Sequence, residues 1–160
     1  MRAEVEVREA DFSVHEEYAR LRGEPGGTGA CVLFTGLVRD WTGAGSALAL
    51  ELEHYPGMTE SSIAAIVDEA RARWRLGAVR VIHRVGRLAP GEQIVLVGVS
   101  SAHRGDAFAA CEFIMDYLKT RAPIWKKEIG AADARWVESR GSDAHAAERW
   151  RDSKTKEETT

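Results

Sequence analysis

The spacing of apolar residues along the chain predicts two long amphipathic helices. Apolar residues three and four positions apart predict the first helix over about 58–75: Ile63, Ile66, Val67, Ala70 and Trp74. The same spacing predicts the second over about 104–121: Ala107, Phe108, Cys111, Ile114, Met115 and Leu118. Pro123 ends the second helix, because the residue before a proline is pushed out of helical conformation.

Shorter stretches have the patterns of strands. Val5 and Val7 alternate with charged residues, which predicts a half-buried first strand. Ser13, with Glu16 three residues later, is a capping box for a short helix that ends near Leu21. Five further strands are predicted: a continuously apolar, buried strand from Ala30, and strands over about 47–55, 79–85, 94–99 and 124–129. A short strand over 135–138 and one or two helical turns over 142–150 complete the chain.

The order of these elements predicts an α+β fold of two layers, with a mostly antiparallel sheet and two long helices. The turn over 89–92 joins neighbouring strands as an antiparallel pair would be joined, and we expect the helices on one side of the sheet. Residues 1–150 make one domain, and the polar residues 151–160, which lack periodicity, make a flexible tail.

Composition narrows the class of protein without indicating its chemistry. The chain has 160 residues, 44% hydrophobic and 29% charged, with a formal net charge of −3. Such values are typical of a globular domain and argue against a dedicated nucleic-acid binder. The sequence contains neither an apolar stretch of membrane-spanning length nor the apolar core of a signal peptide, so we expect a cytoplasmic protein that binds no membrane. Cys31 and Cys111 match no metal or redox spacing and are expected to be buried, inert thiols.

Positive charge is concentrated in one segment. Four cations fall within nine residues that contain no acid: Lys119, Arg121, Lys126 and Lys127. On composition alone, a solvated basic stretch remains an alternative. However, the proline break places Lys119 and Lys126 on separate rigid elements, and Glu128 shares a strand face with Lys126, which it can orient. Repulsion among clustered cations disfavours the charged form, so one lysine can act as a nucleophile or proton shuttle.

Two other places suit an anionic ligand. His103 and Arg104 open the second long helix, where unpaired backbone N–H groups favour a phosphate. The alternative there is that Ser101 or His103 only caps the helix, and Asp106 would compete for Arg104. Arg39 follows a strand end, where a purely structural role remains open. His83 alternates with valines and is predicted to be a core histidine.

Five blocks along the chain resemble the large, catalytic subunit of molybdopterin synthase, over about residues 3–150. The last block, the thirteen residues 116–128, is long and unusual, and the match is therefore specific. The blocks read in order Phe-Thr-Gly-Leu-Val-Arg from Phe34, Leu-Glu-His-Tyr-Pro-Gly-Met from Leu52, His-Arg-Val-Gly from His83, Ser-Ala-His-Arg from Ser101, and Asp-Tyr-Leu-Lys-Thr-Arg-Ala-Pro-Ile-Trp-Lys-Lys-Glu from Asp116.

The resemblance implies a sulfurtransferase. In that family the large subunit forms a homodimer within a heterotetramer, with a small ubiquitin-like subunit docked at each end. The C-terminal Gly-Gly of the small subunit carries a thiocarboxylate, which donates sulfur to cyclic pyranopterin monophosphate. Two transfers build the dithiolene of molybdopterin. The fold implied is of the α/β hammerhead type, and neither a metal nor a cofactor of the subunit itself is implied.

The resemblance also implies roles for individual residues. Lys119 matches the lysine closest to the thiocarboxylate, and Lys126 matches a second functional lysine. The pocket for the substrate is implied at Arg39, His103 and Arg104, with flanking positions at Leu37, Val38, Lys127 and Glu128 and a further arginine at Arg140. In the family, residues from both protomers complete one pocket.

Two readings of other classes stay open from the sequence. The basic segment would also suit a non-catalytic phosphate- or RNA-binding module, although the rest of the chain carries a charge of about −7. The second of these alternatives is an enzyme that carries a persulfide on Cys111. If the sulfur arrives on a partner, neither cysteine has to be nucleophilic.

Overall fold

The computed structural model describes residues 4–131, 133–138 and 141–151. Within these residues the helices are α1 (Val14–Arg22), α2 (Met58–Arg73), α3 (Arg104–Arg121) and α4 (Gly141–Glu148). The strands are β1 (Val5–Arg8), β2 (Ala30–Leu37), β3 (Ala47–His54), β4 (Val79–Arg84), β5 (Gly86–Leu88), β6 (Gln93–Ser101), β7 (Ile124–Gly130) and β8 (Ala134–Val137). The bounds of α3 match its prediction, and α2 ends slightly earlier than predicted.

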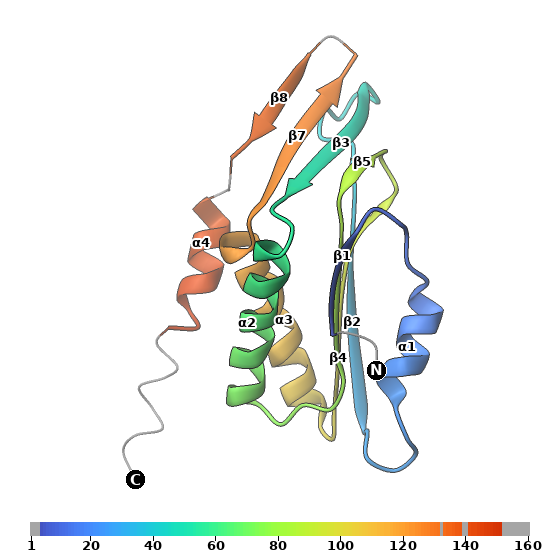
Figure 1. Ribbon diagram of the computed structural model, residues 1–160, viewed down its shortest axis with the longest axis vertical. Coiled ribbons are helices and arrows are strands. Elements are labelled where there is room, and N and C mark those ends of the chain that lie inside the picture. Colours follow the sequence, from blue (N-terminus) through green and yellow to red (C-terminus); the bar gives the residue numbers. More distant parts are fainter. Residues whose placement is uncertain (1–3, 132, 139–140, 152–160) are drawn as a thin grey trace.

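The strands form two sheets, which the sequence pattern did not separate. The first sheet has the order β1-β4-β6-β2 and the second the order β5-β3-β7-β8. Every described pair is antiparallel except β1 with β4, which are parallel. The second sheet extends beyond one end of the first (Figure 1). The predicted α+β class with a mostly antiparallel sheet is confirmed.

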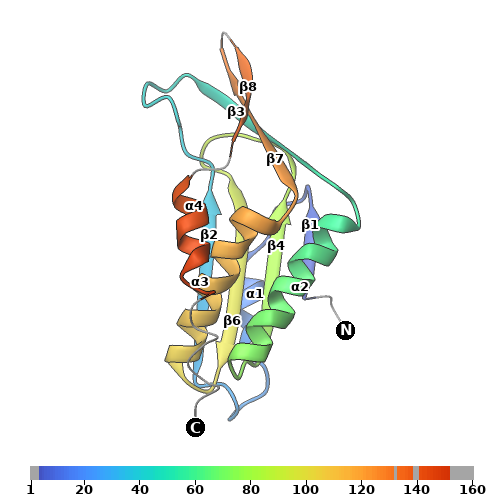
Figure 2. The same ribbon diagram turned by 90° about the vertical axis from the view of Figure 1, so that its left-hand side faces the viewer.

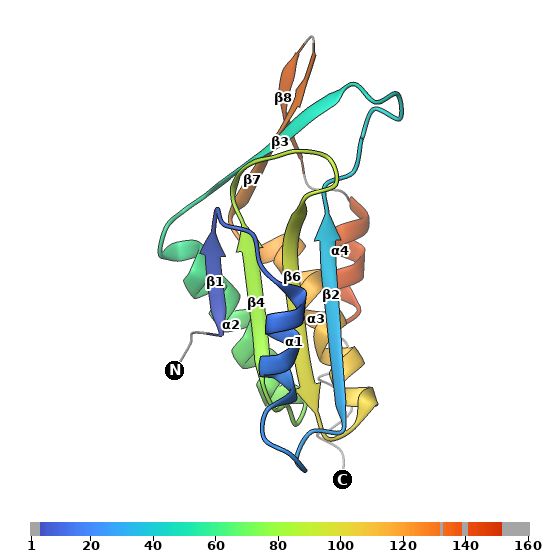
Figure 3. The same ribbon diagram turned by 90° about the vertical axis from the view of Figure 1, so that its right-hand side faces the viewer.

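The helices cover both faces of the first sheet. The long helices α2 and α3 lie together on one face, as predicted, and α4 lies beside α3 (Figure 2). The short helix α1 lies on the opposite face (Figure 3), so the expectation that all helices share one side was wrong. The reason is local: α1 presents Leu21 to the strands, and Phe12 just before it joins a small core with Ile82 and Leu96.

The main core lies between the first sheet and its two long helices. The apolar faces predicted for α2 and α3 meet the inner face of β4 and β6 there. Its largest fully buried side chains include Phe113 and Ile114 of α3 and Ile63 and Ile66 of α2. A smaller core of Val38, Leu50, Leu52, Val85 and Leu88 lies where the second sheet meets the first. The end of α3 and the start of β7 are therefore held between two packed cores.

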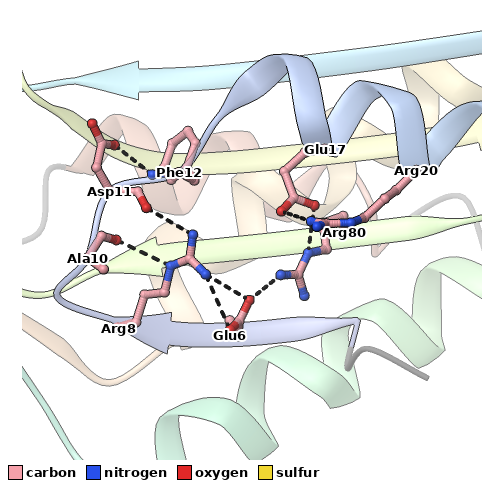
Figure 4. A network of polar contacts seen from close by, with 8 residues as sticks. All are labelled: Glu6, Arg8, Ala10, Asp11, Phe12, Glu17, Arg20 and Arg80. Atoms are coloured by element: carbon pink, nitrogen blue, oxygen red, sulfur yellow. Dashed lines mark hydrogen bonds and ion pairs between the residues drawn. The ribbon is translucent and has the colours of Figure 1, made fainter.

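A network of ion pairs around the buried Arg80 and Glu17 fastens α1 to the sheet. Arg80 on β4 donates to Glu17 of α1 at 3.0 Å and also pairs with Glu6 of β1. Glu17 also accepts from Arg20 at 2.6 Å, while Arg8 pairs with Glu6 (Figure 4). Since buried charges are tolerated only when they are paired, this network fixes which face of α1 meets the sheet.

One strand differs from its prediction. The uncharged run that opens β2 was expected to be buried, but its residues are half-buried and Phe34 is 40% exposed. Cys31 in this run is also only half-buried, so its predicted burial was wrong. The cause is the position of β2 at the edge of the first sheet, where β6 is its only described neighbour.

Candidate functional site

Lys119 lies in the last turn of α3 and its side chain is half-exposed. The carboxylate of Asp143 in α4 lies 3.5 Å from its ammonium nitrogen. The carbonyl end of a helix attracts cations, so the last turn of α3 is a favourable place for the Lys119 side chain. Helix α4 is held against α3 by Asp116, which accepts from Arg149 and from the indole of Trp150, both at 2.7 Å. The surroundings of Lys119 are thus fixed by two packed helices.

The turn between α3 and β7 sets the position of Lys126. The carbonyl of Pro123 accepts from the buried hydroxyl of Thr59 at 3.0 Å, and the same hydroxyl accepts from the backbone of Tyr55. This double contact anchors the turn to the start of α2. Lys126 lies three residues further on, opposite Leu52 of β3 and Val137 of β8. The two predicted lysines therefore stand on separate elements with a fixed connection, as the sequence predicted.

The neighbours of Lys126 along β7 have partners on β8. The ammonium of Lys127 lies 5.5 Å from the ring centre of Trp136, a cation–π contact. Glu128 pairs with Arg135 at 3.2 Å. That Glu128 orients Lys126, as the sequence suggested, remains a prediction. The contact with Arg135 is one that the sequence pattern did not indicate.

Arg39 is held at the end of β2 by the residue before it. Val38 is buried, and its backbone donates to Glu92 at 2.8 Å and accepts from Gly91 at 2.7 Å. Leu37 and Arg39 on either side are exposed. Arg39 has no ion-pair partner among the described residues, so its guanidinium is available to an anion.

The loop after Arg39 is organised by a residue that sequence reasoning missed. The carboxylate of Asp40 accepts from the backbone of Thr42 at 2.9 Å and from that of Gly45 at 2.5 Å. The hydroxyl of Thr42 also donates to this carboxylate. Together the hydrogen bonds lower the pKa of Asp40, and the bond from the Thr42 hydroxyl has the largest effect. The available signal was an aspartate followed closely by Gly43 and Gly45, both of which have positive φ.

His103 and Arg104 lie at the other end of α3. His103 is the residue before the helix, and its side chain makes no capping hydrogen bond. Its backbone donates instead to the Ser101 hydroxyl at 3.4 Å, so Ser101 supplies the local support. Both side chains are exposed and line an open pocket of about 550 Å³ with Gly29, Ala102 and Gly105. Among the described residues, Asp106 forms no ion pair with Arg104, so the expected competition is not seen.

The predicted site residues therefore form two groups in one chain. Lys119, Lys126 and Arg39 lie at one end of the helical layer, where β2 and α3 finish and β7 begins (Figures 2 and 3); we call this the lysine end. His103 and Arg104 lie at the opposite end, which we call the histidine end. Lys119 lies sixteen positions after His103, which corresponds to about 24 Å at the rise of an α-helix. Arg140 lies outside the described residues.

His83 and Cys111, which the sequence predicted to be buried in the core, are buried. His83 is buried, and its Nδ1 lies 2.8 Å from the Arg84 carbonyl. Burial lowers the pKa of His83 to about 4, and the nearby charge of Lys126 acts in the same direction. Burial also raises the pKa of the Cys111 thiol to about 11. Within the described residues, no cluster of metal-binding side chains is present and no helix is long and apolar enough to cross a membrane.

Known proteins are similar to this chain in sequence and in fold. Residues 7–121 match the family model described as "MoaE protein". The chain belongs to the MoaE family. The molybdopterin synthase catalytic subunit of Escherichia coli is 61% identical over 139 residues, which cover 87% of this chain and 92% of that protein.

Solved structures agree with this assignment. The molybdopterin biosynthesis MoaE protein from Burkholderia ambifaria has a TM-score of 0.79 and 48% identity, with 93% of this chain and 98% of that chain covered. A complex of subunits 1 and 2 of the molybdopterin-converting factor from Helicobacter pylori has a TM-score of 0.72 at 18% identity, covering 86% of this chain and 92% of that one, which supports the fold alone. The family predicted from the five sequence blocks is confirmed.

Proposed function

We propose that this protein is the catalytic subunit of a molybdopterin synthase. In this proposal it transfers sulfur from the C-terminal thiocarboxylate of a small ubiquitin-like subunit to cyclic pyranopterin monophosphate, and two transfers form the dithiolene. Membership of the MoaE family supports the reaction. The observation that carries the assignment of residues is the lysine end, where Lys119 and Lys126 stand on two elements joined by an anchored turn.

The lysine end supplies charge and protons to the reaction. In each transfer the thiocarboxylate sulfur bonds to a carbon of the pterin as an oxygen leaves that carbon, and water then cleaves the bond between the sulfur and the acyl carbon, which leaves the small subunit with a carboxylate. A cation beside the reacting atoms stabilises the negative charge that develops. Lys119 is assigned the place nearest the thiocarboxylate, and Lys126 acts as a second acid or base. Asp143, 3.5 Å from Lys119, orients its ammonium group. No cysteine of this chain takes part, in keeping with the buried thiol of Cys111.

The remaining site residues bind and position the substrate. Arg39, His103 and Arg104 are assigned to the phosphate of the pterin, since the N–H groups of arginine and histidine side chains donate well to phosphate oxygens. Leu37, Val38, Lys127 and Glu128 form the walls near the lysine end, and Arg140 is assigned to substrate binding as well. Residues 1–150 make up the catalytic domain. The protein works as a homodimer within a heterotetramer, in the cytoplasm, and binds neither membrane nor nucleic acid.

Reconstitution tests this function directly. The full chain is mixed with a thiocarboxylated small subunit and cyclic pyranopterin monophosphate, and the dithiolene product is measured. The matched control is the same small subunit with an ordinary C-terminal carboxylate. Product that forms with the thiocarboxylated small subunit, and not with the carboxylate control, supports the function. Failure to form product with an active donor and precursor would reject it.

A further inference from the structure

His83 is a polar residue on an otherwise apolar face of β4. Side chains alternate along a strand, so His83 shares its face with Val79 and Val81, which belong to the main core between the first sheet and the two long helices (Figure 2). His83 is only 8% exposed, and Val85 just beyond it belongs to the small core. A valine would pack there at a lower cost, since burial of a polar group is unfavourable unless the group is hydrogen-bonded. Packing therefore does not explain the imidazole.

The fold uses only one nitrogen of this ring. Nδ1 lies 2.8 Å from the carbonyl oxygen of Arg84. A carbonyl oxygen only accepts, so Nδ1 carries the proton of the neutral ring and Nε2 is the acceptor. Among the described residues, Nε2 of His83 has no hydrogen-bond partner, whereas every fully enclosed polar side-chain atom has one. Nε2 is therefore an acceptor that is not fully enclosed by the fold.

Lys126 lies on the face of the second sheet that is turned towards the end of β4. On β7 it is opposite Leu52 of β3, and opposed residues of an antiparallel pair point to the same face of their sheet. Leu52 is buried in the small core together with Val85, two residues after His83. Lys127, the next residue of β7, points to the other face of the sheet. Of these two neighbouring lysines, only Lys126 starts from the face that packs near His83.

The charges around the ring keep it a neutral acceptor. Burial lowers the pKa of His83 to about 4, and the charges of Lys126 and His54 act in the same direction. His54 follows Leu52 on the same face of β3, and its Nε2 lies 3.8 Å from a carboxylate oxygen of Glu60 in α2. A neutral imidazole does not repel an ammonium group, and the lone pair of its Nε2 attracts one.

We propose that His83 is a positioning residue for Lys126, in which Nε2 of His83 accepts a hydrogen bond from the Lys126 ammonium group. The inference rests on the proposed function, in which Lys126 acts as an acid or base, and adds a residue to that site. A lysine side chain has four flexible carbons, whereas an acid or base has to be held in a narrow geometry. One N–H bond held by Nε2 leaves the other N–H bonds of the ammonium group directed away from the core, towards the reacting oxygen.

Two substitutions of His83 separate the two ring nitrogens. By the length of its side chain, His83→Gln puts an amide near the place of Nε2, and His83→Asn puts one near the place of Nδ1. Sulfur transfer should stay near normal in His83→Gln. In His83→Asn, kcat should fall about tenfold with KM unchanged, since a hydrogen bond to a charged group contributes about a factor of ten or more. Equal activities, or an active His83→Asn with an impaired His83→Gln, would overturn the proposal.

The loss in His83→Asn should also depend on Lys126. Each substitution is made alone and together with the other, and kcat is compared across the four proteins. His83→Asn should have no further effect on a chain that already carries Lys126→Ala. A purely structural role would lower kcat by the same factor in both backgrounds, and that result would overturn the proposal.

The nitrogen resonances of His83 test the contact without any assay of activity, and they decide the question if a His83 variant does not fold. In the full chain, Lys126→Ala should shift the ¹⁵N resonance of Nε2. Lys127→Ala is the matched control and should leave it in place, because Lys127 points to the opposite face of β7. An unchanged Nε2 resonance in Lys126→Ala would overturn the proposal. An unmodified chain that makes no product rejects the proposed function, whereas the resonances still show whether His83 and Lys126 are in contact.

Discussion

The two main clusters of charge in this protein differ in how completely their charges are partnered. Around Arg80, whose side chain is 7% exposed, Glu17 and Glu6 supply carboxylates at the positions that the guanidinium needs. At the lysine end, the side chain of Lys119 is 52% exposed with one carboxylate at 3.5 Å, and Arg39 is exposed. Charges that are buried and fully paired hold the fold together. Charges that are exposed and partly paired retain the capacity to bind an anionic substrate.

Lys119→Ala should have the largest effect, and it should fall on activity. Removing a group that moves protons in the reaction lowers the rate by about 10²–10⁴-fold. Because Lys119 is exposed, stability should change by no more than about 1 kcal/mol. Sulfur transfer and urea unfolding are measured on the same preparation. Arg121→Ala, at the same end of α3 and paired with Glu69, serves as the control and should keep its activity. Normal turnover in Lys119→Ala would contradict its catalytic assignment.

The effect of Arg80→Met should fall on stability rather than on activity. It leaves two carboxylates without their buried cation, and breaking such a pair costs about 3–5 kcal/mol of unfolding free energy. Denaturant unfolding measures this loss. Arg121→Ala is again the control, since an exposed ion pair contributes about 1 kcal/mol at most. A loss below that of the control would show that the network is not what fastens α1.

Acid should destabilise the fold through His83. Its pKa is lowered from 6.5 to about 4, so the unfolded chain binds the proton more readily than the folded one. The contribution to stability is complete above pH 6.5 and is lost as the pH falls towards 4, by about 3 kcal/mol in total. Unfolding curves at several pH values should show a shallower pH dependence for His83→Gln than for the unmodified chain. The exposed His145→Gln serves as the control substitution, and a slope in His83→Gln identical to that of the unmodified chain would refute the assignment.

Cys111→Ser should have the smallest effect. The thiol is buried with a pKa of about 11, so little thiolate forms near neutral pH. A serine hydroxyl can donate to the same Val97 carbonyl, and we expect full activity with a stability loss of about 1 kcal/mol. Reconstituted sulfur transfer checks this. Loss of sulfur transfer in a folded Cys111→Ser protein would instead favour an enzyme that carries a persulfide on Cys111.

Much of the secondary structure could be predicted because the interactions that fix it join residues close together in the sequence. The bounds of α3 were predictable because helical spacing and Pro123 act within a few residues of each other. The Ser13 cap was equally local, and its hydroxyl accepts from the Glu16 backbone at 3.3 Å. The parallel pairing of β1 with β4 was not predictable, because it joins segments more than seventy residues apart. The contact between Lys119 and Asp143 was missed for the same reason.

The sequence by itself indicated the family, the order of the helices and of the strands other than β5, and a prediction of the site residues, since these depend on residue identity and short-range spacing. Only the tertiary structure separated that site into a lysine end and a histidine end. It also placed an apolar, uncharged strand at the edge of its sheet, where its pattern alone predicted burial. The physical reason is that hydrophobicity tells which residues favour burial, whereas the packing of the whole chain decides which of them are covered.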